Sequence, residues 1–196
     1  MDLGRLQRAS EELHAFLEKE STVRARPALR VSLLQNEDHT PLPLRLEEPL
    51  VWPETCYAWF GVGAVPGGTD AYCATSSEFR SEVWNAYLER EGHRDPVAHL
   101  QRDREIPHHW RFRRSAGQPA VINLAYGLLA ASLASLTEGI VFSDDNAWDY
   151  GRFPARADDF LSWYFRPGQA LDPQFRDWAV RCVASLPEEL AAGGEP

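Results

Sequence analysis

Hydrophobic positions in the N-terminal part of the chain change from a helical to a strand-like spacing. Over residues 3–19 the apolar side chains share one helical stripe, formed by Leu3, Leu6, Leu13, Phe16 and Leu17. Residues 29–34 (LRVSLL) instead alternate between apolar and polar side chains, as a half-buried strand does. Residues 56–65 (CYAWFGVGAV) resume the strand pattern, and the glycine turn that follows predicts that residues 71–75 (AYCAT) return as a partner strand.

Between these strands and beyond them, prolines and two helical stretches interrupt the pattern. Residues 41–53 (PLPLRLEEPLVWP) carry prolines that would interrupt a central strand, which favours an edge or a crossing segment. Ser77 can cap a helix predicted over residues 78–90, and a short helix is expected near residues 95–104. Residues 108–114 (HHWRFRR) alternate again and predict a further strand.

The longest uncharged segment, residues 115–137, predicts a buried helix at the centre of the fold. It is long enough to cross a bilayer, which takes about 20 residues. Its polar residues, its proline and its preference for alanine over leucine and isoleucine disfavour membrane insertion. We therefore expect a buried helix near residues 120–137, with Pro119 near its first turn and Gly139 as its C-terminal stop.

The C-terminal part continues with mixed elements. Residues 139–143 (GIVFS) predict a buried strand that leads into a loop. Pro154 is expected to open a helix, Asp172 to cap another, and the tail over residues 191–196 to fray. Because helices and strands are interspersed without a βαβ rhythm, the sequence predicts an α+β fold in a single domain over residues 1–190, with helices packed on a largely antiparallel sheet.

Composition and charge narrow the class of protein. The 196 residues are 44% hydrophobic and 25% charged, which is the ordinary range for a globular protein with one sizeable core. A formal net charge of -9 disfavours contact with nucleic acid or an anionic membrane, and it suits a cationic partner or solubility alone. The three cysteines form no CxxC pair and the N-terminus has no apolar signal segment, so we expect a cytoplasmic protein.

Acidic and aromatic residues gather in the loop after the predicted strand at 139–143. The candidate partner-binding residues are Asp144, Asp145, Trp148, Asp149 and Tyr150. Aspartate and asparagine often bond the local backbone in turns, so a plain loop is one interpretation. A hard-cation site is a second, although the EF-hand spacing is missing. Recognition of a basic partner is the third, because aromatic side chains beside carboxylates are typical of protein-binding hot spots.

A second candidate site involves the histidines, four of which fall in one short region: His93, His99, His108 and His109. On a strand, His108 and His109 would face opposite sides, so the two cannot chelate one metal ion together. His109 would share its side with Arg111 and Arg113. These three residues are a candidate cationic stripe for a phosphate or an acidic peptide, and a solvated strand face is the alternative.

The known catalytic motifs GxSxG, Walker A and HExxH are missing from the sequence. We therefore expect a binding protein that uses no cofactor. The alternative is a metal-assisted hydrolase or transferase whose bound ion would lower the pKa of water. Its ligands would come from Asp144, Asp145 and Asp149 together with His108 or His109. A third option is a scaffold subunit that self-associates through the Trp-rich segment 148–178.

Residues 124–150 (LAYGLLAASLASLTEGIVFSDDNAWDY), followed by residues 153–165 (FPARADDFLSWYF), place a small-residue helix before a strand and an acidic aromatic loop. This order resembles small bacterial immunity proteins of polymorphic toxin systems. The resemblance covers about residues 121–165. It implies a cytosolic α+β protein that neutralises a toxin domain by binding it, without chemistry of its own, and it assigns no binding residue.

Overall fold

The computed structural model describes six stretches of the chain: residues 3–24, 26–45, 55–75, 108–113, 117–143 and 152–192. The helices expected over residues 78–90 and 95–104 lie outside these described residues. So do the five acidic-loop residues Asp144, Asp145, Trp148, Asp149 and Tyr150. The fold and the candidate site below are therefore built from the other segments.

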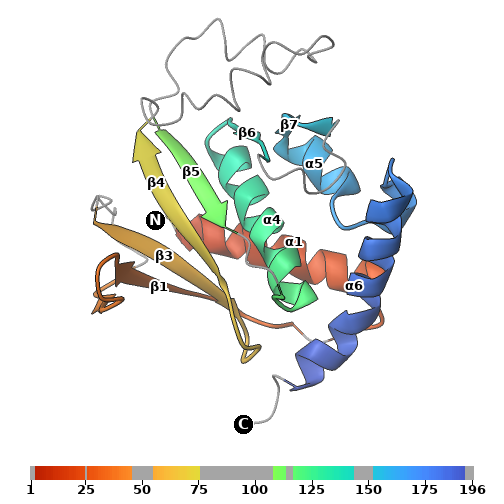
Figure 1. The fold of residues 1–196 in the computed structure, drawn as a ribbon, viewed down its shortest axis with the longest axis horizontal. Helices are drawn as coiled ribbons and strands as arrows, with labels where there is room; N and C mark the ends of the chain where they lie inside the picture. Colours follow the sequence, from red (N-terminus) through yellow and green to blue (C-terminus); the bar gives the residue numbers. More distant parts are fainter. Residues whose placement is uncertain are drawn as a thin grey trace, which may run out of the picture.

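A five-stranded sheet with the order β2-β1-β3-β4-β5 forms one side of the structure (Figure 1). Its strands are β1 (Leu29–Gln35), β2 (Pro41–Leu42), β3 (Cys56–Val62), β4 (Thr69–Thr75) and β5 (His108–Arg113). Every neighbouring pair is antiparallel. Together with the helices, this sheet confirms the predicted α+β class. The short β2 lies at one edge, where the proline-rich segment was expected to lie.

Four helices are described: α1 (Leu3–Glu20), α4 (Ala120–Leu136), α5 (Ala157–Trp163) and α6 (Pro173–Ala192). A 3-10 turn, η2 (Pro167–Gln169), joins α5 to α6, and β6 (Ile140–Val141) pairs with β7 (Ala155–Arg156). In Figure 1, α1 and α4 lie against one face of the five-stranded sheet, and α5 and α6 lie beyond α4. The helices therefore cover the sheet on one side.

The central helix predicted near residues 120–137 is α4, and it is confirmed. Thirteen of its seventeen residues are buried, and no charged residue occurs in it. Gly127 allows the ring of Tyr164 to lie directly on the helix backbone, because a Cβ at this position would overlap that ring. Among the described residues, none of the helices combines the length and the apolar character needed to cross a bilayer.

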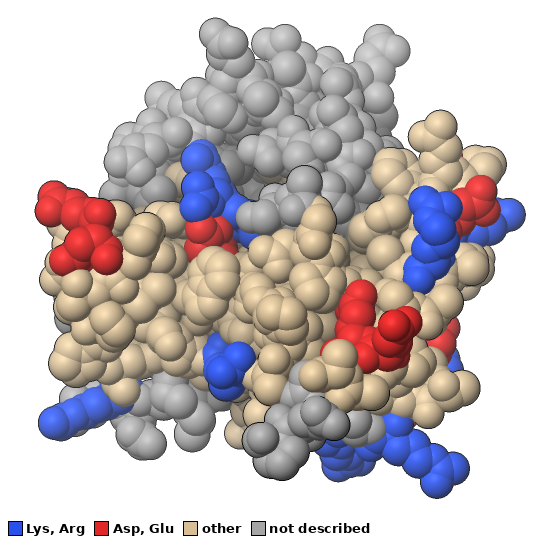
Figure 2. All heavy atoms as spheres, turned by 60° about the horizontal axis from the view of Figure 1, so that its bottom comes forward, with Lys and Arg blue, Asp and Glu red and all other residues tan. Residues whose placement is uncertain are grey.

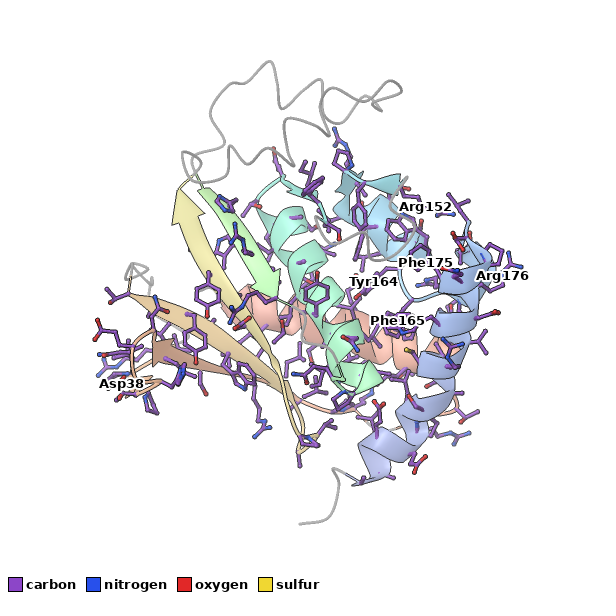
Figure 3. All side chains as sticks on the ribbon, in the orientation of Figure 1. Asp38, Arg152, Tyr164, Phe165, Phe175 and Arg176 are labelled. Atoms are coloured by element: carbon purple, nitrogen blue, oxygen red, sulfur yellow. The ribbon has the colours of Figure 1, made fainter. Side chains whose placement is uncertain are left out.

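Aromatic residues fill the space between α4, α5 and α6. Figure 3 shows Tyr164 and Phe165, which follow α5, lying in this space. The Phe165 ring is 5.3 Å from that of Trp178 on α6 and 6.2 Å from that of Phe16 on α1. Phe165 is fully buried although its backbone is left-handed, with φ 58°. Packing against rings from α1 and α6 therefore holds a conformation that a bulky side chain rarely adopts.

The two ends of α4 are stabilised in different ways. At the N-terminus, the carboxylate of Glu189 from α6 accepts hydrogen bonds from the N–H groups of Ala120 and Val121, each 2.9 Å long. A side chain from another helix thus satisfies two donors that the helix itself leaves open. At the C-terminus, the left-handed residue is Glu138 (φ 53°), whereas Gly139 donates its N–H to Ala134 O. The glycine expected as the stop is therefore not the residue that turns the chain.

The start of α5 differs from the prediction, whereas the start of α6 confirms it. Pro154 does not open a helix, because residues 155 and 156 form β7 first and α5 begins at Ala157. Pairing with β6 has taken priority over the local preference of proline for a first helical turn. In contrast, Asp172 caps α6 as expected, since its Oδ1 accepts the Gln174 N–H at 2.7 Å.

Candidate functional site

The two faces of the five-stranded sheet have different surroundings. The inner face packs on α1 and α4 through a cluster of buried residues: Leu6, Ala9, Ala58, Phe60, Ala71 and Leu129. Trp110 and Phe112 of β5 pack against the same cluster. On the other face, no helix among the described residues packs against the strands (Figure 1). We call this second side the open face.

Strand register places two rows of side chains across the open face. One row runs from β1 to β5 through Ser32, Trp59, Asp70 and Arg113. The next row runs through Leu34, Tyr57, Tyr72 and Arg111. Directly opposed residues of antiparallel strands have neighbouring side chains on the same side of the sheet. Each row therefore crosses from small or apolar residues through aromatic residues to an arginine on β5.

An ion pair between β4 and β5 lies at one end of the first row. Arg113 Nε donates to both carboxylate oxygens of Asp70 at 3.0 Å, and its Nη2 also donates to Oδ2. The Tyr72 hydroxyl accepts a hydrogen bond from Arg113 at 3.2 Å and donates one to Asp70 at 3.4 Å. The Asp70 side chain is 10% exposed, but that of Arg113 is 59% exposed. A buried carboxylate thus holds an accessible guanidinium in one place.

Charge and burial shift the pKa values of this network. The hydrogen bond to Asp70 raises the pKa of the Arg113 guanidinium. Burial, followed by the negative charge of Asp70, raises the pKa of Tyr57 and of Tyr72 above the ordinary value for a phenol. Both hydroxyls therefore stay protonated at neutral pH. They are therefore unsuited to act as bases.

Stacked rings extend the network towards β1. The rings of Tyr57 and Tyr72 stack at 5.3 Å, and Arg113 lies over the Tyr72 ring at 5.0 Å. His39 Nδ1 lies 2.8 Å from the Tyr57 hydroxyl, with the two rings edge to face. His39 is an exposed residue in the left-handed conformation, with φ 60°. Histidine adopts this left-handed conformation more readily than most residues, and the turn places its side chain beside Tyr57.

Two glycines let larger side chains lie flat on the open face. A Cβ at Gly68 would be 2.6 Å from the Trp59 ring and 2.5 Å from Phe60 O, so only glycine fits beneath the indole. Arg30 lies across Gly61, where a Cβ would be 3.3 Å from its Nη2. The half-buried Trp59 and the exposed Arg30 thus complete a surface of aromatic and cationic side chains.

The structure brings together the predicted cationic stripe. His109, Arg111 and Arg113 share the open face, as strict alternation along β5 requires, and both arginines are exposed. The backbone of His108 pairs with that of Thr75. The predicted partner-binding residues, Asp144, Asp145, Trp148, Asp149 and Tyr150, lie outside the described residues. Within the described ranges, no three His, Cys, Asp or Glu residues form a group that could hold a metal ion.

Five residues of the open face were not predicted as site residues from the sequence: His39, Tyr57, Trp59, Asp70 and Tyr72. Asp70 is the second residue of β4, where an aspartate is unfavourable unless its charge has a partner. The strand predicted from the sequence began one residue later, at residue 71, and did not include Asp70. Its partner could not be named from the sequence, since Arg113 is 43 residues away and comes from another strand.

Charge is unevenly distributed between the described residues and the remainder of the chain. The described ranges contain fourteen acidic and fourteen basic residues, so the whole net charge of -9 belongs to the other segments. Figure 2 agrees with this balance, because acidic and basic side chains are scattered between large uncharged areas on the face it shows. The described part of the chain, which includes the open face, therefore has equal numbers of acidic and basic residues.

Three comparisons with known proteins gave no match: no family model, no curated protein and no solved structure matches this chain.

Proposed function

We propose that this protein is a binding module that recognises another protein, and that the open face is one of its contact surfaces. The observation that carries the proposal is the network of Tyr57, Tyr72, Asp70 and Arg113 on the side of the sheet that none of the described helices covers. Protein-binding hot spots are enriched in tryptophan, tyrosine and arginine, and they lie at well-packed centres surrounded by a polar rim. The open face has this composition.

Preorganisation supports the same proposal. Arg113 is held by Asp70, and Tyr72 lies between Tyr57 and the guanidinium, so these long side chains have little rotamer freedom left to lose. Immobilising a flexible side chain on binding opposes association by about 0.5–1.5 kcal/mol. A surface whose side chains are already ordered avoids much of that loss. The arrangement therefore suits recognition of a specific partner.

The biological form that we propose is a cytosolic immunity protein that neutralises a toxin domain by direct binding. The resemblance over residues 121–165 supports it, as does the acidic excess of the segments that include Asp144, Asp145 and Asp149. Carboxylates opposite a basic toxin surface would speed the encounter through electrostatic attraction. The predicted partner is thus a protein with at least one basic region.

The test begins by capturing the partner with a tagged copy of the full chain, at low and at high salt, and identifying it by mass spectrometry. Association of the purified pair is then measured for Trp59→Ala and for Asp144, Asp145 and Asp149 changed together to asparagine. Phe175→Ala is the matched control, because Phe175 is a half-buried aromatic residue on α6. Circular dichroism verifies that each variant is folded.

We expect Trp59→Ala to weaken the complex about tenfold or more, as truncation of a hot-spot residue does. The triple asparagine variant should mainly slow association and reduce its dependence on salt. Phe175→Ala should leave both rates unchanged. If neither the open-face variant nor the triple variant alters binding to a verified partner, the proposal that these surfaces mediate the function is wrong.

A further inference from the structure

The open face carries positive charge in a protein whose formal net charge is -9. Among the described residues, its outward-facing side chains include Arg30, Arg111 and Arg113 but only one carboxylate, Asp70. Arg113 already neutralises that carboxylate. The surplus charge of the open face is therefore opposite in sign to that of the chain as a whole.

The arginines of this face have capacity to bind an anion. Arg30 and Arg111 are exposed, and no residue in the described ranges forms an ion pair or hydrogen bond with either guanidinium. Arg113 uses Nε and Nη2 towards Asp70 and Tyr72, so within the described structure its Nη1 is not engaged. A guanidinium presents five N–H donors and binds carboxylates in pairs of parallel hydrogen bonds.

The spacing of Arg111 and Arg113 matches an extended chain. The two residues are separated by one position on β5, so their Cα atoms lie about 7 Å apart on the same side of the strand. Alternate side chains of any extended segment have the same separation and the same direction. Carboxylates at positions i and i+2 of such a segment would therefore lie opposite the two guanidiniums at once.

We propose that the open face binds an extended acidic segment of a protein partner, with carboxylates at alternate positions paired to Arg111 and Arg113. The half-buried rings of Trp59 and Tyr72 lie in the same two rows as these arginines, and they contact the side chains of that segment. This inference rests on the proposed binding function and names the chemistry of one contact. The partner segment at the open face is negatively charged, whereas the partner surface expected opposite Asp144, Asp145 and Asp149 is positively charged.

Carboxylates fit this surface better than nucleobases do. A single-stranded nucleic acid binds a sheet by stacking its bases on open aromatic rings. Here the Tyr72 ring stacks on Tyr57 and lies under Arg113, and Tyr57 is 6% exposed. Little of either ring is left for a base.

The test uses synthetic heptapeptides of one composition, four threonines and three glutamates, with blocked ends. In one peptide the glutamates alternate with threonine, and in the other they stand at every third position, so that no two glutamates are two residues apart. Binding to the full chain is measured by fluorescence anisotropy at low salt, with a seven-nucleotide oligothymidylate as the nucleic-acid probe. The variants are Arg111→Glu and, as the matched control, Arg181→Glu, which changes an exposed arginine on α6.

We expect the alternating peptide to bind several-fold more tightly than the peptide with glutamates at every third position, because only the alternating spacing engages both arginines. Arg111→Glu should weaken the alternating peptide about tenfold, through loss of one charge-assisted contact and addition of a repulsive charge. Arg181→Glu should have no effect. The inference is overturned by equal affinity for the two peptides, by equal effects of the two variants, or by tighter binding of the oligothymidylate.

Failure of this inference can be separated from failure of the proposed function. With a verified partner, loss of binding in Trp59→Ala but not in Arg111→Glu would keep the binding function and remove the acidic segment from it. Unchanged binding in both variants and in the triple asparagine variant would remove both proposals. Weakened binding in both Trp59→Ala and Arg111→Glu would support both.

Discussion

The open face and the helical side of the molecule use similar residues to different ends. On the helical side, Tyr164 is 2% exposed, donates its hydroxyl hydrogen to Asn123 O at 2.6 Å and packs on Gly127. On the open face, Tyr72 is half-buried and its hydroxyl joins a network of charged groups. Tyr164 is thus part of the packed interior, whereas Tyr72 helps to hold the exposed Arg113 in place.

The ion pairs of the two regions differ in the same way. Arg166 and Glu20 are each 23% exposed and join α1 to the turn after α5, with their side-chain N and O atoms 2.8 Å apart. Arg113 is 59% exposed although its partner is almost buried. Exposed charges contribute little to stability because water competes for them. This contrast indicates that the helical side carries most of the stability, whereas the open face carries groups available to a partner.

Enlarging the closest helix contact should have the largest effect on this comparison. In Gly127→Ala, the new Cβ would overlap the Tyr164 ring, so we expect the free energy of unfolding to fall by about 3 kcal/mol. Urea denaturation measures the change. Gly168→Ala is the control, because no atom lies within 4 Å of a Cβ there. A loss below 1 kcal/mol in Gly127→Ala would show that the interior is loosely packed, since that is well under the overpacking range.

Removing the cap that joins α6 to α4 should have the next largest effect. Glu189→Ala deletes the carboxylate that accepts two backbone hydrogen bonds at the start of α4. The expected loss is about 2 kcal/mol, with a smaller loss for Glu189→Gln, which keeps one acceptor. Thermal unfolding should rank the two variants in this order. The neighbouring exposed Glu188→Ala serves as control, and an equal loss there would contradict the role of the cap.

Breaking the open-face ion pair should have a smaller effect on folding. Asp70→Asn removes the charge and keeps the shape, and we expect a loss of about 1 kcal/mol, reduced because Arg113 is largely exposed. Arg113→Ala should be more harmful than Asp70→Asn, since it leaves a buried carboxylate without its partner. Denaturation of both variants measures the difference. The reverse order would mean that Asp70 is stabilised by something other than Arg113.

The smallest expected effect concerns alkaline pH. The raised pKa values of Tyr57 and Tyr72 mean that folding favours the protonated phenols. Stability from this source is therefore complete below about pH 10, the usual pKa of an exposed tyrosine, and is lost as pH rises through the higher values of the folded state. Ultraviolet titration should show one fewer late-ionising tyrosine in Tyr72→Phe. Asp70→Asn should shift the ionisation of Tyr72 to lower pH, and an unshifted titration would argue against the influence of Asp70.

Much of the fold was predictable because it depends on local periodicity. The stripe in α1, the alternation in β1 and β5 and the uncharged run in α4 each identify an element without reference to the others. Errors occurred where a distant contact decided the outcome. Pairing between β6 and β7 delayed the start of α5 beyond Pro154, and Glu138 rather than Gly139 took the left-handed position after α4.

The candidate site was predictable only in part. Alternation alone placed His109, Arg111 and Arg113 on one side of β5. It gave no sign that Arg113 pairs with Asp70, because that contact depends on the register between two strands far apart in sequence. Asp70 stood just before the strand predicted over residues 71–75, so neither its place in the sheet nor its partner could be predicted.

By itself, the sequence determined the α+β class, the central buried helix, the net charge and the direction in which β5 side chains alternate, because each follows from spacing or composition within one segment. Only the tertiary structure decided which face of the sheet the helices cover, and which aromatic residues meet the arginines on the other face. The physical reason is that register and packing depend on free energies shared between distant segments, and no single segment encodes them.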